Sequence, residues 1–394
     1  MSGTCSTPDR LPPPLAAWAQ AALDEIGSLA LSRQRLGFDA VTLMGERASL
    51  MGLPQPGRVS AGGACRLVEC AQGTIALSLP RADDWDLLPA LFESPGPYSW
   101  TEVERLAAAR DARQLVERAR VLGLAAARAD LLPLPPAPMP LPQPRGPAPA
   151  RPPVVLDLTA LWAGPLAGHL LERGGAHVIK VESHGRTDGA RRGHAGFYAL
   201  LNQNKLCITA DLATAEGRER LLELIARADI VLESTRPRAL RQFGIDAAAL
   251  VAARPGLTWV SITAHGHGSP EEDWAGFGDD AAAAAGLCAA VREAIGKLAF
   301  IGDALADPLT GIAAARAAWK GWRSGGGGLI GLSLHDSVAL AMQYDREAFA
   351  DGWKTMFARA AGEGYPAPRL REAEGPVAAV GTHDDWPLEV LLAC

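Results

Sequence analysis

The chain has 394 residues, of which 48% are hydrophobic and 21% are charged, and its formal net charge is −6. This length suits two or three domains, each able to bury a core. An acidic chain with no long basic run argues against a nucleic-acid surface, so we expect no nucleic-acid partner. The longest run of small apolar residues, 281–290, is too short to cross a bilayer, and residues 1–10 lack the apolar core of a secretion signal. We therefore expect a soluble, cytoplasmic protein with no membrane partner.

The cysteines and histidines do not form a metal-binding pattern. Six cysteines are scattered along the chain with no pair at CxxC spacing, and Cys65 and Cys70 lie in a strand-like segment that suits core packing. His265 and His267 are two residues apart, with no carboxylate or cysteine at a ligand spacing. We predict no metal site.

Residues 1–130 predict a small α+β domain. Two strand-like segments in it are separated by the turn residues Gln72 and Gly73, and helical patterns precede and follow them. The expected elements are, in order, helix 14–36, strands 65–70 and 74–79, and helices 83–88 and 100–127.

Residues 131–153 separate this part from the rest of the chain. They hold eleven prolines in twenty-three positions. Such a composition does not form a packed core and favours extended backbone, so we predict a semi-rigid linker.

From residue 154 the pattern changes to apolar strands that alternate with helix-length segments. Strands this apolar indicate a mostly parallel sheet that is covered by helices on both faces. The expected strands are 154–159, 176–182, 206–211, 229–233, 257–263 and 329–334, and helices are expected at 165–173, 215–228 and 246–254. The fold class is therefore α/β: a Rossmann-like, doubly wound large domain over 154–345, with the small α+β domain before it and a C-terminal return segment over 346–394.

In a doubly wound sheet, ligands bind outside the carboxyl ends of the strands. The segments at these ends are 160–165, 182–186 and 234–238, and residues 202–205 precede a further strand. Several cations lie in these segments although the chain is acidic overall. Each one alone is most simply a solvated surface residue. Together they suit a polyanionic ligand such as a nucleotide phosphate.

Asp307 stands at the expected start of a helix. The pair Asp307-Pro308 follows an apolar segment and precedes the helix-forming run 312–319, so we predict that Asp307 is the N-cap and that Pro308 lies in the first turn. The positive end of the helix is expected to keep the carboxylate ionised at neutral pH. The simplest role for such a residue is capping alone, but a cap uses one oxygen and leaves the other free for chemistry.

Eight motifs in one order resemble the class III CoA transferases, a family that includes carnitine and formyl-CoA transferases and 2-methylacyl-CoA racemases. The resemblance runs from residue 154 to about residue 337. Its motifs are VLDLT at 155–159, WAGP at 162–165, GAHVIKVE at 175–182, LNQNK at 201–205, DIVLE at 229–233, FGI at 243–245, RPGLTWVSI at 254–262 and DPLTG at 307–311.

The resemblance implies that Asp307 is a covalent nucleophile. It would attack an acyl-CoA to give an acyl-aspartyl anhydride, and an aspartyl-CoA thioester would then pass CoA to an acceptor acid. No tightly bound cofactor is implied, because CoA is a substrate and thioester carrier. The expected partners are an acyl-CoA, a small carboxylic acid and a second copy of the chain in an interlocked homodimer. The implied CoA contacts are Trp162, Ser183, Lys205, Ser234, Arg236, Gln242 and Phe243.

The chain departs from the family pattern in three ways. Only Arg236 is an evident phosphate-pairing cation among the six positions that hold CoA contacts in characterised relatives, which are Trp162, Ser183, Ser234, Arg236, Gln242 and Phe243. The racemases use a histidine in the segment that corresponds to 275–280, where this chain has Phe277. The small-domain sequence precedes the large domain instead of interrupting it. We therefore expect a CoA transferase first, with two alternatives: a racemase that recruits Asp279 or Asp280 as a second base, and a CoA-binding relative without turnover.

Overall fold

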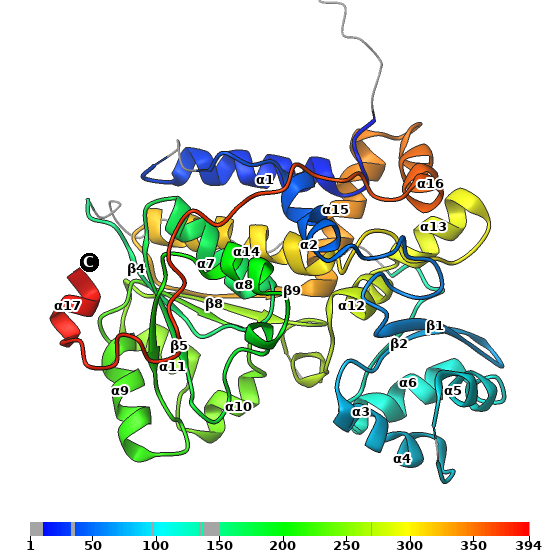
Figure 1. Cartoon of the computed structure of the whole chain (residues 1–394), viewed down its shortest axis with the longest axis horizontal. Helices are drawn as coiled ribbons and strands as arrows, with labels where there is room; N and C mark the ends of the chain where they lie inside the picture. The colour runs from blue at the N-terminus through cyan, green and yellow to red at the C-terminus, as the bar shows by residue number, and fades with distance from the viewer. Residues whose placement is uncertain are drawn as a thin grey trace, which may run out of the picture.

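The computed structural model describes residues 11–32, 36–96, 98–133, 136, 150–268 and 270–393. Most of the predicted proline-rich linker lies outside these residues. Within them are a six-stranded parallel sheet and a three-stranded antiparallel sheet, each with helices against it (Figure 1). No helix in the described segments combines the length and the hydropathy that crossing a membrane requires.

The large sheet is a doubly wound parallel sheet, as predicted. Its strand order is β6-β5-β4-β7-β8-β9, and every neighbouring pair is parallel. The order reverses between β4 and β7, so the topological switch point lies where these two strands end. The strands are β4 (Val154–Asp157), β5 (His177–Glu182), β6 (Leu206–Thr209), β7 (Ile230–Glu233), β8 (Thr258–Thr263) and β9 (Gly328–Ser333).

Alternate residues of the strands feed two cores, one on each face of the sheet. Val155 belongs to the core that contains α1, α7, α14 and α15, whereas Leu156 belongs to the core beneath α9 and α11. Figure 1 shows these helices on opposite sides of the sheet. The helices of this half are α7 (Ala163–Arg173), α8 (Ala195–Asn202), α9 (Ala215–Ile225), α10 (Pro237–Gln242), α11 (Ala247–Ala253), α12 (Gly278–Ala284), α13 (Leu287–Ile295), α14 (Ala306–Arg323), α15 (Leu334–Ala348) and α16 (Trp353–Glu363), with 3-10 turns at Gly189–Arg192 and Glu271–Asp273.

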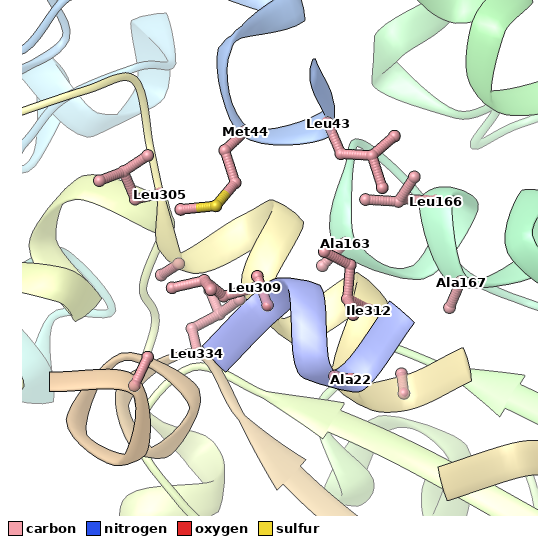
Figure 2. Close-up of a cluster of buried hydrophobic side chains, with 14 of the residues drawn as sticks. Ala22, Leu43, Met44, Ala163, Leu166, Ala167, Leu305, Leu309, Ile312 and Leu334 are labelled. Atoms are coloured by element: carbon pink, nitrogen blue, oxygen red, sulfur yellow. The ribbon is translucent and has the colours of Figure 1, made fainter. Parts of the chain in front are cut away.

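The first two helices pack on the large sheet's helices and not on the small sheet. Helix α1 (Ala16–Leu29) and helix α2 (Ala40–Met51) contribute Ile26, Leu43 and Met44 to the core that also contains α7 and α14. Figure 2 shows Leu43 directed toward Leu166 of α7, and Met44 directed toward Leu309 of α14. By this packing, α1 and α2 belong with the large sheet and its helices. The domain boundary at residue 130 stays a prediction.

The small sheet is antiparallel, in the order β1 (Cys65–Cys70), β2 (Gly73–Ser78) and β3 (Ala125–Arg128). The single helix predicted over 100–127 is wrong. The Asp111 carboxylate accepts a hydrogen bond from the Gln114 N–H at 3.0 Å and starts a second helix, and the alanine run at 125–128 pairs with β2. Alanine has little strand preference, so only the open edge of β2 makes this segment a strand. The helices here are α3 (Ala82–Asp86), α4 (Leu88–Phe92), α5 (Trp100–Ala107) and α6 (Ala112–Val121).

The chain after α16 crosses the molecule as an extended segment and ends in α17 (Leu388–Ala393) at the far edge of the large sheet (Figure 1). There it satisfies the outer strand, because the backbone N–H of Cys207 donates to His383 Nδ1 at 3.0 Å and that of Thr209 donates to the Asp384 carboxylate at 2.7 Å. These contacts cover the edge of β6, which would otherwise present unpaired backbone groups.

Candidate active site

The loop that leaves β4 forms one wall of the site at the switch point. Leu161 adopts a left-handed backbone conformation with φ of 70°, which is unfavourable for a leucine. Its N–H donates to Asp188 at 2.9 Å, and the Thr159 carbonyl accepts a hydrogen bond from Lys180 Nζ at 2.9 Å. The loop is therefore held in a strained shape by side chains from the β5 side.

Two buried ion pairs stand behind this loop. Lys180 contacts Asp188 at 2.9 Å and Lys205 contacts Asp157 at 2.8 Å, and all four side chains are at most 1% exposed. Burial alone would raise the pKa of Asp157, but the cations of Lys205 and Lys180 outweigh it and lower the pKa. Each charge has an opposite partner, so this region fixes the loop without a free reactive group.

A cleft of about 210 Å³ opens where β4 and β7 end. Ala160, Leu161 and Gly164 line it from the β4–α7 loop, and Ser234, Thr235 and Arg236 line it from the segment after β7. The end of β8 and the segment after it contribute further residues, and Asp307 of α14 completes the wall. The cleft occupies the position where ligands bind in folds of this type.

Asp307 lies in the first turn of α14 but is not its N-cap, so that prediction is wrong. The helix begins at Ala306, its N-cap is Leu305, and no side chain caps it. Pro308 does lie in the first turn, as predicted. The Asp307 side chain is only partly buried and faces the cleft, and the backbone N–H of Ala163 donates to its carboxylate. Because neither carboxylate oxygen is needed as a cap, the group is available for chemistry.

The backbone opposite Asp307 leaves no room for a side chain. A Cβ atom on Gly278, the first residue of α12, would overlap the nearer carboxylate oxygen of Asp307. It would also come within 2.7 Å of Ala304. Gly278 therefore lets the two helix starts approach each other and holds the carboxylate in place.

Asp307 does not keep the low pKa that was expected from the helix end. Burial, aided by the nearby carboxylates of Asp279 and Asp303, raises its pKa to about 7, although the Arg47 guanidinium and the Ala163 N–H favour the ionised form. Loss of solvent thus outweighs the helix dipole. A carboxyl group with this pKa exists in both protonation states near neutral pH, as catalytic groups often do.

Two further acidic side chains surround Asp307. Asp279 of α12 accepts a hydrogen bond from the Ala304 N–H at 3.1 Å, and burial together with Asp303 raises its pKa to about 6. Asp303, which is 1% exposed, forms a two-point ion pair with Arg47 of α2 at 2.7 and 2.5 Å. Sequence reasoning missed Arg47 because it is 256 residues away from Asp303 in the chain and no local pattern links them.

Two arginines bring positive charge to the cleft. Arg236 was predicted; burial, Arg238 and Arg81 lower its pKa. Arg81 was missed because it reaches the cleft from the N-cap of α3 beside the small sheet, where it pairs with Asp84. Since these cations repel one another, a bound anion would be favoured between them.

The structure brings only some of the predicted site residues together. Asp307, Ser234 and Arg236 line the cleft. Trp162 is 2% exposed and lies under Arg47, with 4.7 Å between the guanidinium and the ring centroid. The Lys205 ammonium is buried and bonded to Asp157, Asn202 and the Pro165 carbonyl.

Three further predicted CoA contacts, like Trp162 and Lys205, lie outside the cleft wall. Ser183 is in the turn that follows β5, where its carbonyl accepts a hydrogen bond from the Arg186 N–H at 3.0 Å. Gln242 ends α10, and Phe243, 40% exposed, follows it. Their role in CoA binding stays a prediction.

The cleft wall, as far as the chain is described, carries no histidine, and Phe277 occupies part of it. His265 is buried, with Nε2 at 3.9 Å from Asp280, and burial lowers its pKa to about 3. It is therefore neutral and lies behind the wall. Among the described residues no three His, Cys, Asp or Glu side chains are arranged so that they could hold a metal ion.

The sheet order is that of a doubly wound α/β protein. The Asp307 carboxyl group, in the cleft wall at the switch point, is its candidate nucleophile. A family model for CoA-transferase family III matches residues 153–386, more than half of the chain. The chain therefore belongs to CoA-transferase family III, as the motifs predicted.

Two curated relatives are similar over about half of this chain. A succinyl-CoA–D-citramalate CoA-transferase of Chloroflexus aurantiacus is 34% identical over 208 residues, which cover 50% of this chain and 52% of the relative. A succinate–glutarate CoA-transferase of Agrobacterium fabrum is 33% identical over 216 residues, covering 49% and 54%. The chain thus spans about half the length of the curated relatives it matches. A crystal structure of a CaiB/BaiF family protein from Brucella suis aligns with a TM-score of 0.45, 32% identity and coverage of 50% and 57%.

Proposed function

We propose that this protein transfers CoA from an acyl-CoA to a carboxylic acid, with Asp307 as the covalent nucleophile. The observation that carries the proposal is the Asp307 carboxylate, which opens into the switch-point cleft and accepts a hydrogen bond from the Ala163 N–H. Membership of CoA-transferase family III supports the same reaction.

The proposed reaction conserves every group through four steps. An ionised Asp307 oxygen attacks the thioester carbonyl, the C–S bond breaks, and CoA leaves as a thiolate from an acyl-aspartyl anhydride. The thiolate attacks the aspartyl carbonyl and expels the first acid as its carboxylate. The acceptor carboxylate then attacks this aspartyl-CoA thioester to give a second anhydride and a thiolate. Attack of the thiolate on the new acyl carbonyl yields the product acyl-CoA and restores the Asp307 carboxylate.

A carboxylate nucleophile suits this reaction for an energetic reason. Each intermediate must be about as reactive as a thioester, because transfer returns the thioester bond in the product. An anhydride meets this condition, whereas a serine ester would be too stable. The Ala163 N–H beside Asp307 is suitably placed to bind negative charge that develops on the aspartyl group.

The arginines of the cleft suggest where the anionic parts of the substrates bind. We infer that Arg236 pairs with a phosphate of CoA and that Arg81 pairs with a carboxylate of the acyl group or acceptor. The names of the two relatives contain succinyl-CoA or succinate with a second dicarboxylic acid. Succinyl-CoA with citramalate or glutarate is therefore the first substrate pair to test.

The test is to trap the aspartyl intermediate. The protein is incubated with succinyl-CoA and hydroxylamine, digested and analysed by mass spectrometry, and we expect a hydroxamate on Asp307. Asp307→Asn should abolish transfer, by about 10³-fold or more, with the fold intact. The matched control is Asp345→Asn, because Asp345 is also a buried carboxyl group with a pKa raised to about 7 by burial, but it bonds to the Leu15 N–H away from the cleft.

Three other outcomes would contradict the proposal. Full activity of Asp307→Asn would remove Asp307 as the nucleophile. Exchange of the α-hydrogen of an acyl-CoA with deuterated water, without an acceptor acid, would favour a racemase in which Asp307 is a general base. CoA binding without turnover on a broad panel of acids would favour a non-catalytic relative.

We also propose that the protein acts in the cytoplasm as an interlocked homodimer. The homodimer rests on the family resemblance. The cytoplasmic location rests on the composition of the chain, which is acidic and 48% hydrophobic. Light scattering coupled to gel filtration should give twice the mass of one chain, and a mass of one chain would contradict it.

A further inference from the structure

The charges around Asp307 come from four separate elements. Arg47 lies on α2, Asp279 on α12, Asp303 in the segment before α14, and Asp307 on α14 itself, while the Ala163 N–H comes from α7. One cation is thus set among three carboxyl groups. With all three ionised, the group would carry two uncompensated negative charges in a largely buried place, so a proton is retained within it.

Arg47 is held firmly in this group. Its Nε and one terminal nitrogen both donate to Asp303, and its guanidinium lies 4.7 Å from the centroid of the buried Trp162 ring. The side chain is only 25% exposed. The other terminal nitrogen, Nη1, has no hydrogen-bond partner among the described residues. Arg47 therefore donates two hydrogen bonds to Asp303, and its Nη1 donors are available to another oxygen.

The helix that carries Arg47 is fixed from two directions. Leu43 and Met44, just before it on α2, are fully buried against α7 and the start of α14 (Figure 2). Glu46, also fully buried, accepts hydrogen bonds from Arg371 of the C-terminal segment at 2.8 and 2.7 Å. The position of Arg47 is therefore set by packing on both sides and does not depend on its own ion pair.

A purely structural role for Arg47 would be to tie α2 to the start of α14 through Asp303. That role needs one cation and one carboxylate. The arrangement goes further, because Asp307 lies four residues after Asp303 and beside Ala163, which follows the Trp162 that Arg47 covers. The Asp307 charge also changes during the proposed reaction. Asp307 must be ionised to attack, is neutral in the anhydride and the thioester, and is ionised again on release. A neighbouring cation favours the ionised form alone.

We propose that Arg47 is a positioning residue that holds Asp307 in its ionised, attacking form and divides its charge between Asp303 and Asp307. The proposal rests on the proposed function and deepens it. Nothing in the local sequence around Asp307 indicates this residue, because it is supplied by a helix that precedes the matched family region.

The test is the pH dependence of single-turnover aspartyl formation in three variants. In Arg47→Gln, the acid limb of the pH profile should move up by about one pH unit, with a loss of about fivefold at pH 7 that approaches tenfold at lower pH and shrinks toward pH 9. KM for the acyl-CoA should change by less than about threefold. Arg47→Lys keeps the positive charge, so the acid limb of its pH profile should lie within about half a pH unit of the wild-type position. Arg47→Gln combined with Asp303→Asn removes one charge of each sign and should return the limb toward the wild-type position.

An equal loss at every pH, or a change in KM alone, would overturn the proposal, because a structural or binding role acts independently of the Asp307 proton. The double variant also covers the case in which Arg47→Gln does not fold, since it leaves no unpaired buried carboxylate.

A second readout separates this inference from the proposed function. Carboxyl ¹³C NMR of aspartate-labelled protein, with Asp307→Asn to assign the signal, follows the Asp307 titration without any substrate. We expect its midpoint near pH 7 in the wild type and about one unit higher in Arg47→Gln. An unchanged midpoint overturns the role of Arg47 whatever the activity. A shifted midpoint in a protein that forms no aspartyl adduct supports the role of Arg47 and contradicts the proposed function.

Discussion

Two buried charged regions flank the cleft, and they are built on opposite principles. Behind the β4–α7 loop, two lysines face two carboxylates, and the pKa of Asp157 is lowered despite its burial. Around Asp307, one arginine faces three carboxyl groups, and burial raises the pKa of both Asp279 and Asp307. Burial favours the neutral carboxyl form in both regions, but only in the first do the cations equal the carboxylates in number, so the charge balance accounts for the direction of the pKa shift.

The two regions therefore have different roles: the first fixes the shape of the β4–α7 loop, and the second contains the group proposed to react. The balanced pairs hold the loop from Thr159 to Leu161, which places Leu161 in the wall of the cleft, and they have no reason to exchange protons. The unbalanced group retains a proton near neutral pH and contains the candidate nucleophile. We therefore expect changes in the first region to affect folding most, and changes in the second to affect activity and its pH dependence.

The largest expected effect comes from unbalancing the first region. Asp157→Ala leaves the Lys205 ammonium buried without its partner and should lower the free energy of unfolding by about 3–5 kcal/mol, measured by urea denaturation. The double change Asp157→Leu with Lys205→Met removes both charges and should cost clearly less. Equal losses in the single and double variants would contradict a balanced pair.

Next in size is the effect of filling the space opposite Asp307, the proposed nucleophile. Gly278→Ala places a Cβ against the Asp307 carboxylate and should lower kcat by about 100-fold by displacing it, with a smaller change in stability. Gly362→Ala in α16 is the matched control, because no atom lies near its new methyl group and alanine favours helices. Comparable activity of the two variants would show that the close approach at Gly278 does not matter.

A smaller effect is expected at the mouth of the cleft. Arg81→Ala should raise KM for succinyl-CoA or its dicarboxylic acceptor by about tenfold and leave a monocarboxylic acyl-CoA nearly unaffected. Arg236→Ala should instead raise KM for every acyl-CoA, since all carry the same phosphates. If both variants lose the same amount on every substrate, Arg81 does not select the dicarboxylate.

The smallest effect on activity is expected at a buried carboxyl group that belongs to neither region, where the change is one of stability. Burial raises the pKa of Asp345 to about 7 from a usual value near 3.8. The folded chain thus binds this proton between about pH 4 and 7 where the unfolded chain has lost it. The stability it contributes is complete below pH 4 and is lost as the pH rises through 7. Asp345→Asn cannot ionise, so its stability relative to the wild type should be greater at pH 8 than at pH 5 by about 3 kcal/mol, as thermal unfolding at both values would reveal.

The alternation of strands and helices was sufficient to predict the doubly wound sheet and the edge of the sheet at which the cleft opens. Ser234, Arg236 and Asp307 were identified because each follows directly on a strand or opens a helix, and such positions are local features of the chain. The family was likewise readable from short motifs in a fixed order. Elements with no distinctive local pattern were missed, and α2 is one of them. The segment of β3 was predicted as helix, because alanine favours helices when no strand edge is near.

Tertiary structure alone decided which site residues are buried, which charges surround Asp307 and how far its pKa is shifted. It enclosed Trp162 and Lys205 in the interior, brought Arg81 and Arg47 to the cleft region from the first hundred residues, and set Gly278 against Asp307. It also turned the expected ionised cap into a carboxyl group with a pKa of about 7. The physical reason is that element type and strand ends follow from neighbouring residues. Desolvation and charge balance depend instead on all groups within several ångströms, whatever their separation in the chain.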